Sequence, residues 1–159
     1  MKKRSSGVLM HITSLPGKQG IGTFGKSAYD FVDFLEETAQ TYWQILPLTT
    51  TSYGDSPYQS FSAVAGNLNL IDFDLLSNEG LLEKEDYERV NFGENPERID
   101  YALLSETRRP ILEKAVSNTK NNSAILAEIE QFEKENASWL SDYAEYMAIK
   151  ESFGYQSFI

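Results

Sequence analysis

Apolar and polar residues follow two different spacing patterns over the first half of the chain, one typical of strands and one typical of a helix. Residues 7–13 and 42–48, GVLMHIT and YWQILPL, are short and nearly continuous apolar runs, as expected for buried strands. Between them, with Ser27 as the expected N-cap, apolar residues recur at helical spacing and acidic residues lie opposite. The predicted apolar face comprises Ala28, Phe31, Val32, Leu35 and Ala39. The order strand, helix, strand predicts a βαβ unit, whose two strands are parallel.

The next segment, residues 67–76, alternates between apolar and polar positions as NLNLIDFDLL. This alternation predicts a third, half-exposed strand or extended segment. On such a segment Asp72 and Asp74 share one face, because side chains two apart point the same way. A carboxylate pair raises the question of acid–base chemistry, but a solvent-facing strand edge is the favoured interpretation.

The pattern changes after Ser77. Residues 79–100 are charged and rich in turn formers, and from Tyr101 the spacing becomes helical. It predicts a short helix up to Arg109, another that opens with Pro110 as its first residue, then helices over about 123–135 and about 138–153. On the last helix the following aromatic and apolar residues share a face and predict packing: Trp139, Tyr143, Tyr146 and Met147.

Charge excludes several classes of partner. The net charge is −10, and most of the acidic excess lies after residue 78. Nucleic acids and anionic membrane surfaces attract the opposite sign, so neither is expected as a partner, whereas a neutral ligand remains open. With 41% hydrophobic and 13% aromatic residues in 159, the chain is expected to fold around a core.

Cysteine is absent, so disulfides and thiol chemistry are excluded, and a single histidine rules out a histidine-rich metal site. We expect no metal. The apolar run near the N-terminus is too short for a signal peptide, and no stretch is long enough for a membrane span. These observations predict a cytoplasmic protein.

The motif GIGTFG, residues 20–25, matches the glycine spacing of a dinucleotide-binding fingerprint. Two physical requirements of that site fail. Residues SLPGKQ separate the motif from the preceding strand, and the second predicted strand is followed by threonines instead of the acidic residue that holds a ribose hydroxyl. A glycine-bent loop that packs closely, or opens for a ligand, is the better interpretation.

The stretch SYGDSPYQSF, residues 52–61, carries more hydrogen-bonding and aromatic surface than a connector needs. Gly54 and Pro57 supply turn geometry, and Asp55 or Ser56 can bond back to a nearby N–H. The two tyrosines, Tyr53 and Tyr58, add flat apolar faces with polar edges, which suit a sugar. An ordinary surface turn is the alternative.

Taken together, SGVLMHITSLPG, GIGTFG, YWQILPL and YGDSPYQSFSAVAGNLNLIDFDLL closely resemble the N-terminal part of the 4-alpha-glucanotransferases, or amylomaltases. The likeness is strongest from Ser6 to Leu76 and continues more weakly in RIDYALL and WLSDYAEYMAIKESFG. The chain departs from the family pattern at Ile12, at Thr49–Thr50 and at Leu68–Asn69. The first two departures border the binding loops, so they bear on loop shape and ligand preference.

The resemblance implies a fold of class α/β: residues 1–78 as the first βαβ part of a (β/α)₈ barrel, and residues 79–159 as an inserted, mainly helical subdomain. Working groups of such barrels stand on loops at the carboxyl ends of the strands. The implied ligands are maltooligosaccharides or other α-1,4-glucans, with no cofactor. The implied substrate-binding residues are Tyr58 beside the sugar at the cleaved bond, Ser56 with its hydroxyl nearby, and Tyr53 as a stacking face. The case for Asp55 and His11 is weaker, and turn shaping and a structural hydrogen bond are their favoured roles.

The implied reaction passes a segment of an α-1,4-glucan to the 4-hydroxyl of an acceptor with retained stereochemistry. Retention needs two carboxyl groups about 5–5.5 Å apart. In the family these come from later barrel strands, which would lie downstream of Ile159, so we expect no catalytic residue within this sequence. The resemblance therefore predicts the N-terminal portion of a longer enzyme, inactive by itself. A non-catalytic glucan-binding module is the alternative.

Overall fold

The computed structural model describes residues 4–156, with every side chain in that range except that of Tyr53. The chain forms two compact units, Met1–Asn118 and Thr119–Ile159. The strands and helices are β1 Gly7–Leu9, α1 Lys26–Glu37, β2 Tyr42–Gln44, α2 Phe73–Asn78, α3 Tyr101–Thr119, α4 Ser123–Glu135 and α5 Leu140–Ser152. Short 3₁₀ helices cover Ile12–Ser14, Tyr53–Asp55, Leu68–Leu70 and Lys84–Asp86.

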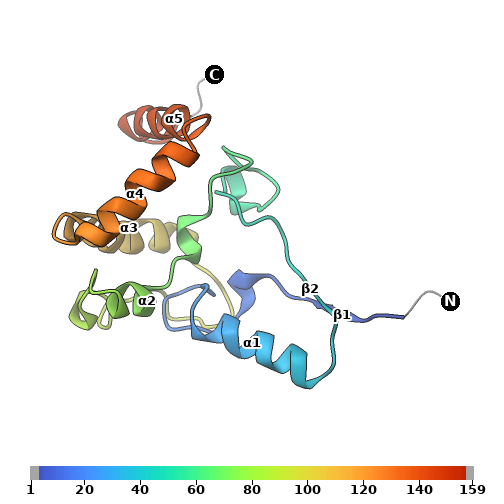
Figure 1. The fold of residues 1–159 in the computed structure, drawn as a ribbon. Helices are drawn as coiled ribbons and strands as arrows, with labels where there is room; N and C mark the ends of the chain where they lie inside the picture. Colours follow the sequence, from blue (N-terminus) through green and yellow to red (C-terminus); the bar gives the residue numbers. More distant parts are fainter. Residues whose placement is uncertain (1–3, 157–159) are drawn as a thin grey trace. The chain divides into compact units, whose positions relative to one another are not determined.

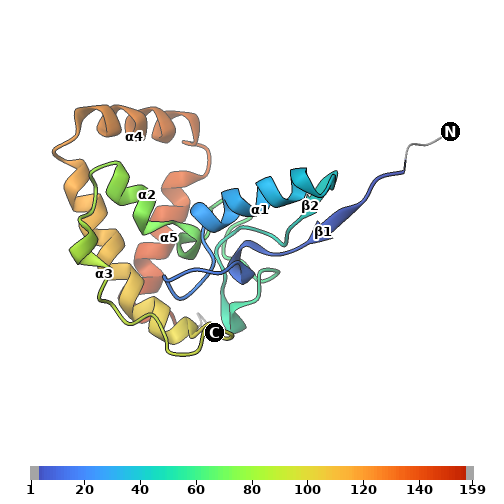
Figure 2. The same ribbon diagram turned by 90° about the horizontal axis from the view of Figure 1, so that it is seen from below.

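Strands β1 and β2 pair in parallel, with Val8 opposite Trp43. Helix α1 connects them and runs alongside the pair in both ribbon views (Figures 1 and 2). The predicted βαβ order with parallel strands is therefore confirmed. Each strand is shorter than its predicted run. After β1 the chain turns into a 3₁₀ helix that starts at Ile12, which is only 1% exposed.

Helix α1 begins two residues earlier than predicted. Its N-cap is Gly25, and Ser27 instead donates its hydroxyl to the carbonyl of Pro16 at 2.5 Å, so the N-cap prediction was wrong. The helix ends in a Schellman-type turn, in which the N–H of Gln40 bonds to the carbonyl of Leu35 and Ala39 takes a φ of +55°. Ala39 therefore lies outside the helix.

One hydrophobic core lies under α1 and the strand pair. Its buried members are Ile12, Leu15, Ala28 and Leu70, with Met10, Phe31, Trp43 and Leu48 packed around them. Phe31 meets Trp43 edge to face, with ring centroids 4.9 Å apart. The predicted apolar face of α1 holds except at Val32, which is 48% exposed, and at Ala39 beyond the helix end.

The prediction of a third strand over 67–76 was wrong. The segment forms a 3₁₀ turn and then α2, and each is capped by a polar side chain. The Asn67 side chain accepts the N–H of Asn69, and the Asp72 side chain accepts that of Leu75. Asp72 and Asp74 are consequently no solvent-facing strand edge, because Asp72 is buried and Asp74 accepts the hydroxyl of Tyr87 at 2.7 Å.

A buried polar cluster joins three segments that are distant in sequence: Gln19, Thr23, Asp72 and Arg108. Asp72 accepts the Thr23 hydroxyl at 2.5 Å and the Gln19 side-chain amide at 3.2 Å. Arg108 donates to the backbone carbonyls of Gln19 and Ile71, and its guanidinium lies 4.2 Å from the ring centroid of Phe73. Burial lowers the pKa of Arg108 to about 10, and the charge of Asp72 opposes that shift.

Close packing explains the GIGTFG motif. A Cβ at Gly22 would overlap the carbonyl oxygen of Ile12, and one at Gly25 would overlap the Asp72 carboxylate. The loop is further fixed by the Phe24 N–H, which donates to the carbonyl of Leu70 at 2.9 Å. Of the two interpretations of this loop, close packing against its neighbours is therefore confirmed.

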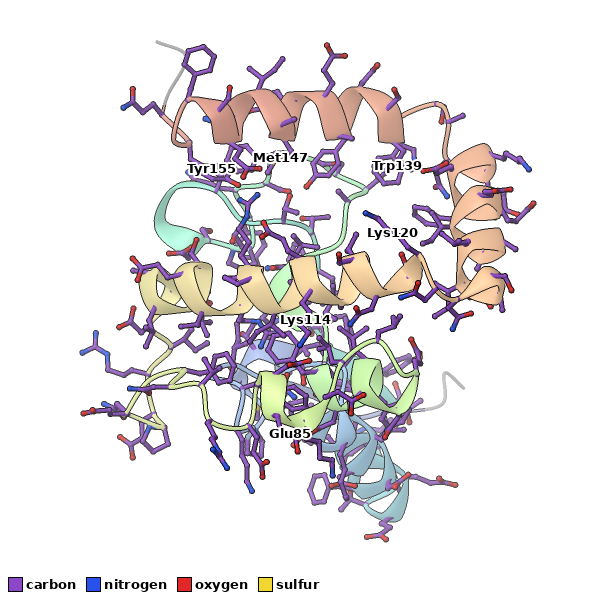
Figure 3. All side chains as sticks on the ribbon, turned by 90° about the vertical axis from the view of Figure 1, so that its left-hand side faces the viewer. Glu85, Lys114, Lys120, Trp139, Met147 and Tyr155 are labelled. Atoms are coloured by element: carbon purple, nitrogen blue, oxygen red, sulfur yellow. The ribbon has the colours of Figure 1, made fainter. Side chains whose placement is uncertain are left out.

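Helix α3 is continuous, so the prediction of two helices meeting at Pro110 was wrong. Proline removes one backbone hydrogen bond, but α3 buries side chains on both sides of it, at Leu104 and Arg108 before and at Ile111 after. Packing therefore carries the helix through the proline. Lys114 on the same helix pairs with Asp86, and Figure 3 shows it on the side of α3 that faces the segment bearing Glu85.

The second unit consists of α4 and α5. The Asn122 side chain caps α4 by accepting the N–H groups of Ala124 and Ile125. Trp139 and Met147 lie along one side of α5, as Figure 3 shows, and the rings of Trp139 and Tyr143 are 6.1 Å apart, in line with the predicted face. Within residues 4–156, no helix is long and apolar enough to cross a membrane.

Candidate functional site

The tyrosine loop, residues 49–66, leaves the carboxyl end of the β2 segment and returns beside its own start. Thr49 forms an antiparallel bridge with Gly66, and flanking backbone bonds join Thr50 to Ala65 and Asn67 to Leu48 at 3.1 and 2.9 Å. These bonds hold the two ends of the loop together.

Hydroxyl groups brace the base of the loop from inside. Thr50, which is buried, shares a 3.2 Å hydrogen bond with Ser60, and the Ser60 hydroxyl donates to the carbonyl of Ser62 at 2.6 Å. The Ser62 hydroxyl oxygen accepts the N–H groups of Val64 and Ala65. The serines that the sequence places here therefore serve the backbone as local turn acceptors.

A tight turn shapes the tip of the loop. The Ser52 N–H donates to the carbonyl of Gln59 at 2.9 Å, and the Tyr58 N–H donates to the Ser56 hydroxyl at 3.3 Å. Gly54 has a φ of +72° and Asp55 one of +53°, so two successive residues adopt the left-handed conformation. That conformation is unusual for a residue with a side chain, and aspartate is among the residues that tolerate it.

The predicted substrate-binding residues of this loop occupy different environments. Tyr58 is 73% exposed, and its ring projects from a backbone fixed on both sides. Ser56 and Asp55 are half-buried. Tyr53 starts the 3₁₀ turn of the tip, and its side chain lies outside the described part of the structure. The loop thus presents one well-placed aromatic face with hydroxyl and carboxyl groups beside it.

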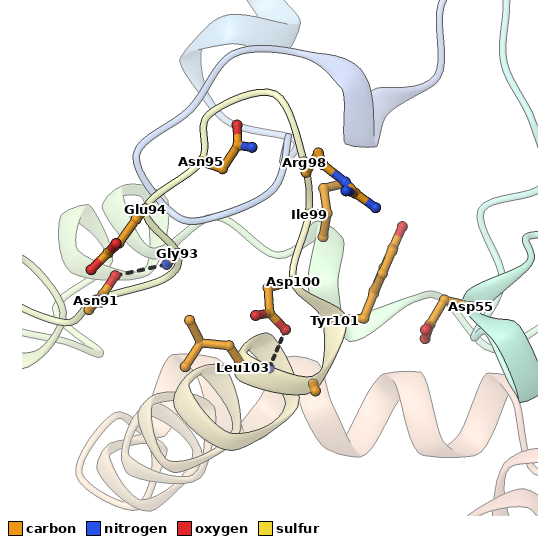
Figure 4. A pocket seen from close by; sticks show the side chains of 11 residues that line it. Asp55, Asn91, Gly93, Glu94, Asn95, Arg98, Ile99, Asp100, Tyr101 and Leu103 are labelled. Carbon is orange, nitrogen blue, oxygen red and sulfur yellow. Dashed lines mark hydrogen bonds between the residues drawn. The ribbon is translucent and has the colours of Figure 1, made fainter.

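A hollow of about 730 Å³ adjoins the loop through Asp55. Its other lining residues come from the segment 91–103, as Figure 4 shows. Asn91 and Asp100 accept the N–H groups of Gly93 and Leu103 at 2.9 and 3.0 Å, so their side chains shape this wall. Tyr101 is half-buried between the wall and Asp55.

Electrostatics link the two sides of the hollow. Burial raises the pKa of Asp55 above its usual value. Burial also raises the pKa of Tyr101, and the negative charge of Asp55 adds to that rise. The residues of this wall were not predicted as site residues. The sequence offered only the stretch RIDYALL as a signal, and no local pattern shows that it reaches Asp55.

His11 lies apart from the tip, at the carboxyl end of β1. Its Nδ1 accepts the backbone N–H of Leu46 at 3.3 Å, so the favoured structural hydrogen bond is present. Burial lowers the pKa of His11 below its usual value. The described residues contain no cluster of histidine, cysteine and carboxylate side chains that could hold a metal ion.

Known proteins match the chain over almost its whole length. The 4-alpha-glucanotransferase family matches residues 10–159. The 4-alpha-glucanotransferase of Streptococcus pneumoniae serotype 4 is 61% identical over 153 residues, which cover 96% of this chain and 30% of that protein. The 4-alpha-glucanotransferase of Thermus thermophilus is 44% identical over 153 residues, with 95% and 30% covered.

A solved structure has a similar fold. The amylomaltase of Streptococcus agalactiae in complex with acarbose superposes with a TM-score of 0.93 at 62% identity, over 98% of this chain and 31% of that one. The chain therefore spans about 30% of the length of the curated relatives it matches.

Proposed function

The chain belongs to the 4-alpha-glucanotransferase family, and from this premise we propose that it supplies a glucan-binding wall of an enzyme that cleaves an α-1,4 bond. In the proposed reaction the donor segment passes to the 4-hydroxyl of an acceptor glucan or glucose with retained stereochemistry. The proposed ligands are maltooligosaccharides or other α-1,4-glucans, and no cofactor takes part. A cytoplasmic location remains a prediction.

The observation that carries this proposal is the placement of Tyr58. A large aromatic side chain that is 73% exposed on a backbone bonded on both sides is held ready for a partner. Aromatic faces pack against the apolar faces of sugar rings, while the phenol edge bonds to hydroxyls. In the proposed site Ser56 donates a further hydrogen bond, Tyr53 offers a second stacking face, and Asp55 shapes the turn.

We propose the (β/α)₈ barrel as the architecture of the whole enzyme, with residues 1–78 as its first βαβ part and 79–159 as a helical insertion. The parallel pairing of β1 and β2 across α1 supports this. Both predicted site segments also follow the carboxyl ends of these strands, where such barrels place their working groups.

The catalytic carboxylates are proposed to lie in the part of the family's length that these 159 residues do not span. Asp72 and Asp74 are already committed to helix capping, the buried polar cluster and Tyr87. The proposal predicts that the purified 159-residue chain will transfer no glucose from maltotriose. Turnover that grows in proportion to the amount of chain would contradict it.

Calorimetric titration of the chain with acarbose tests the binding role. Tyr58→Ala should weaken acarbose binding roughly tenfold, because a stacking face worth about 1 kcal/mol or more is lost, whereas Tyr58→Phe should retain most of the affinity. Tyr29→Ala is the matched control, since Tyr29 is 63% exposed on α1.

An equal loss for the Tyr29 and Tyr58 variants, or none for either, would refute a glucan site at the tyrosine loop. Acarbose binding by a chain that unfolds as one cooperative unit would instead favour the alternative, a non-catalytic glucan-binding module.

A further inference from the structure

Residues 45–47 connect β2 to the tyrosine loop and are almost without backbone support. The last ladder bond before them runs from the Met10 N–H to the carbonyl of Gln44, at 3.0 Å. The next backbone hydrogen bond along the chain is the one at the base of the tyrosine loop, from the Asn67 N–H to the carbonyl of Leu48. Pro47 has no N–H to donate. Within the described part of the chain, the bond from the Leu46 N–H to His11 Nδ1 is the single backbone anchor of this connection.

The backbone of His11 is itself held firmly on both sides. Met10 bonds to β2 through its N–H and accepts the Trp43 indole N–H at 2.7 Å through its carbonyl. Ile12, on the other side, is 1% exposed within the core. The imidazole therefore extends the parallel ladder by one step, with a side-chain acceptor standing where a strand carbonyl would stand.

Accepting an N–H decides where the histidine proton lies. A nitrogen that accepts a hydrogen bond carries no proton, so a neutral imidazole that accepts at Nδ1 has its proton on Nε2. Burial lowers the pKa of His11, which favours the neutral form. An imidazolium would place a second N–H against that of Leu46.

We propose that His11 is a positioning residue for the tyrosine loop: as a neutral imidazole protonated on Nε2, it holds Leu46 and thereby fixes where the base of the loop begins. That this positioning also helps to place Tyr58 against a glucan rests on the proposed function. The positioning of the loop itself does not. The side chain thus joins the loop after β1 to the loop after β2.

The tautomer can be read directly, because the chain contains a single histidine. Nitrogen-15 NMR of the 159-residue chain labelled at histidine should show an unprotonated Nδ1 and a protonated Nε2 at neutral pH. A proton on Nδ1, or rapid exchange between the two tautomers as in a free imidazole, would overturn the proposal.

Two substitutions separate the acceptor from the ring. His11→Asn keeps an oxygen next to Cγ, where Nδ1 stands, whereas His11→Leu keeps the volume and has no acceptor. Amide hydrogen exchange at Leu46 should be about fivefold faster in His11→Leu than in His11→Asn, since one hydrogen bond of about 1 kcal/mol is lost. The Thr50 and Asn67 amides at the loop base should also exchange faster in His11→Leu than in His11→Asn. The exchange of the Met10 amide should be the same in both variants.

Equal exchange in the two variants would overturn the proposal, whether both resemble the wild type or both lose protection. All these readouts are made without a ligand. If they give the expected result and acarbose fails to bind, the proposed function falls and the positioning role of His11 stands. If acarbose binds and the exchange of the Leu46 amide is unchanged by the substitutions, the proposed function stands and the positioning role of His11 falls.

Discussion

Two aspartates beside two glycines show how differently the same residue types work in this protein. Asp72 is buried in the polar cluster, accepts hydrogen bonds from Gln19, Thr23 and the Leu75 N–H, and lies against Gly25, where no Cβ fits. Asp55 is half-buried at the tip of the tyrosine loop, follows Gly54, and has no hydrogen-bond partner for its carboxylate among the described residues. A Cβ at Gly54 would meet nothing within 4 Å.

The comparison distinguishes polar groups whose hydrogen bonds are used within the protein from polar groups that are still available to a ligand. In the buried polar cluster nearly every group is satisfied within the protein, and such groups are costly to disturb. In the tyrosine loop the hydroxyls of Thr50, Ser60 and Ser62 brace the backbone, whereas Tyr58 is 73% exposed and no described residue donates a hydrogen bond to the Asp55 carboxylate. Residue type alone does not distinguish these regions, because in each an aspartate stands beside a glycine and a threonine, Gly25 and Thr23 in one and Gly54 and Thr50 in the other.

The largest expected effect is that of Asp72→Ala. The substitution leaves the Thr23 hydroxyl, the Gln19 amide and the Leu75 N–H without their acceptor and removes the negative charge near buried Arg108. We expect a loss of about 3–5 kcal/mol in the free energy of unfolding, measured by urea denaturation. Asp33→Ala, at an exposed position of α1, is the control and should change it by less than about 0.5 kcal/mol. A similar change in both variants would mean that the cluster contributes nothing special.

The two glycines should respond to alanine for different reasons. Gly25→Ala forces a methyl group into the Asp72 carboxylate, and we expect it to cost about 3 kcal/mol or more of unfolding free energy. Gly54→Ala meets no atom and is opposed only by its φ of +72°, at a cost of about 1–2 kcal/mol. Thermal unfolding of both variants checks the order. A larger loss for Gly54→Ala than for Gly25→Ala would show that the space beside Gly25 is not what limits a side chain there.

The smallest expected effect is the pH dependence that Asp55 contributes. Because its pKa is raised in the folded protein, the folded state holds the proton more tightly than the unfolded state. Stability therefore falls as the pH rises from the ordinary value of 3.8 through the folded pKa. Asp55→Asn, which tolerates the same backbone conformation, should lack this fall.

Unfolding free energies of the Asp55→Asn variant and the wild type, compared below and above that window, provide the measurement. Above this pH range the variant should be more stable relative to the wild type than it is below the range. Parallel curves would show that Asp55 titrates as it does in the unfolded chain.

The sequence predicted the elements whose signals are local. The βαβ order, the parallel pairing of β1 and β2, and helices α4 and α5 follow from apolar spacing over neighbouring residues. The length of β1 did not, because the predicted strand over 7–13 gives way at Ile12 to a 3₁₀ helix, and the burial of Ile12 is a tertiary feature.

Residues 67–76 show why a correct pattern can still mislead. Their alternation of apolar and polar residues fits a strand, but Asn67 and Asp72 are polar because they cap a turn and a helix. Pro110 misled in the opposite direction, since the packing of α3 on both sides outweighs its missing N–H. Contacts over long sequence separations, such as Arg108 with Gln19 or Asp55 with the wall at 91–103, leave no mark in a local pattern.

The bridge between Thr49 and Gly66 has a consequence for engineering. Because both ends of the loop leave the scaffold at one point, the segment between them behaves as an exchangeable cassette. The entropic cost of closing a loop grows only with the logarithm of its length, so a longer or shorter insert changes stability modestly when its ends meet the same anchor. The tips of relatives can therefore be grafted onto this base, and the proposed glucan binding can be compared one cassette at a time.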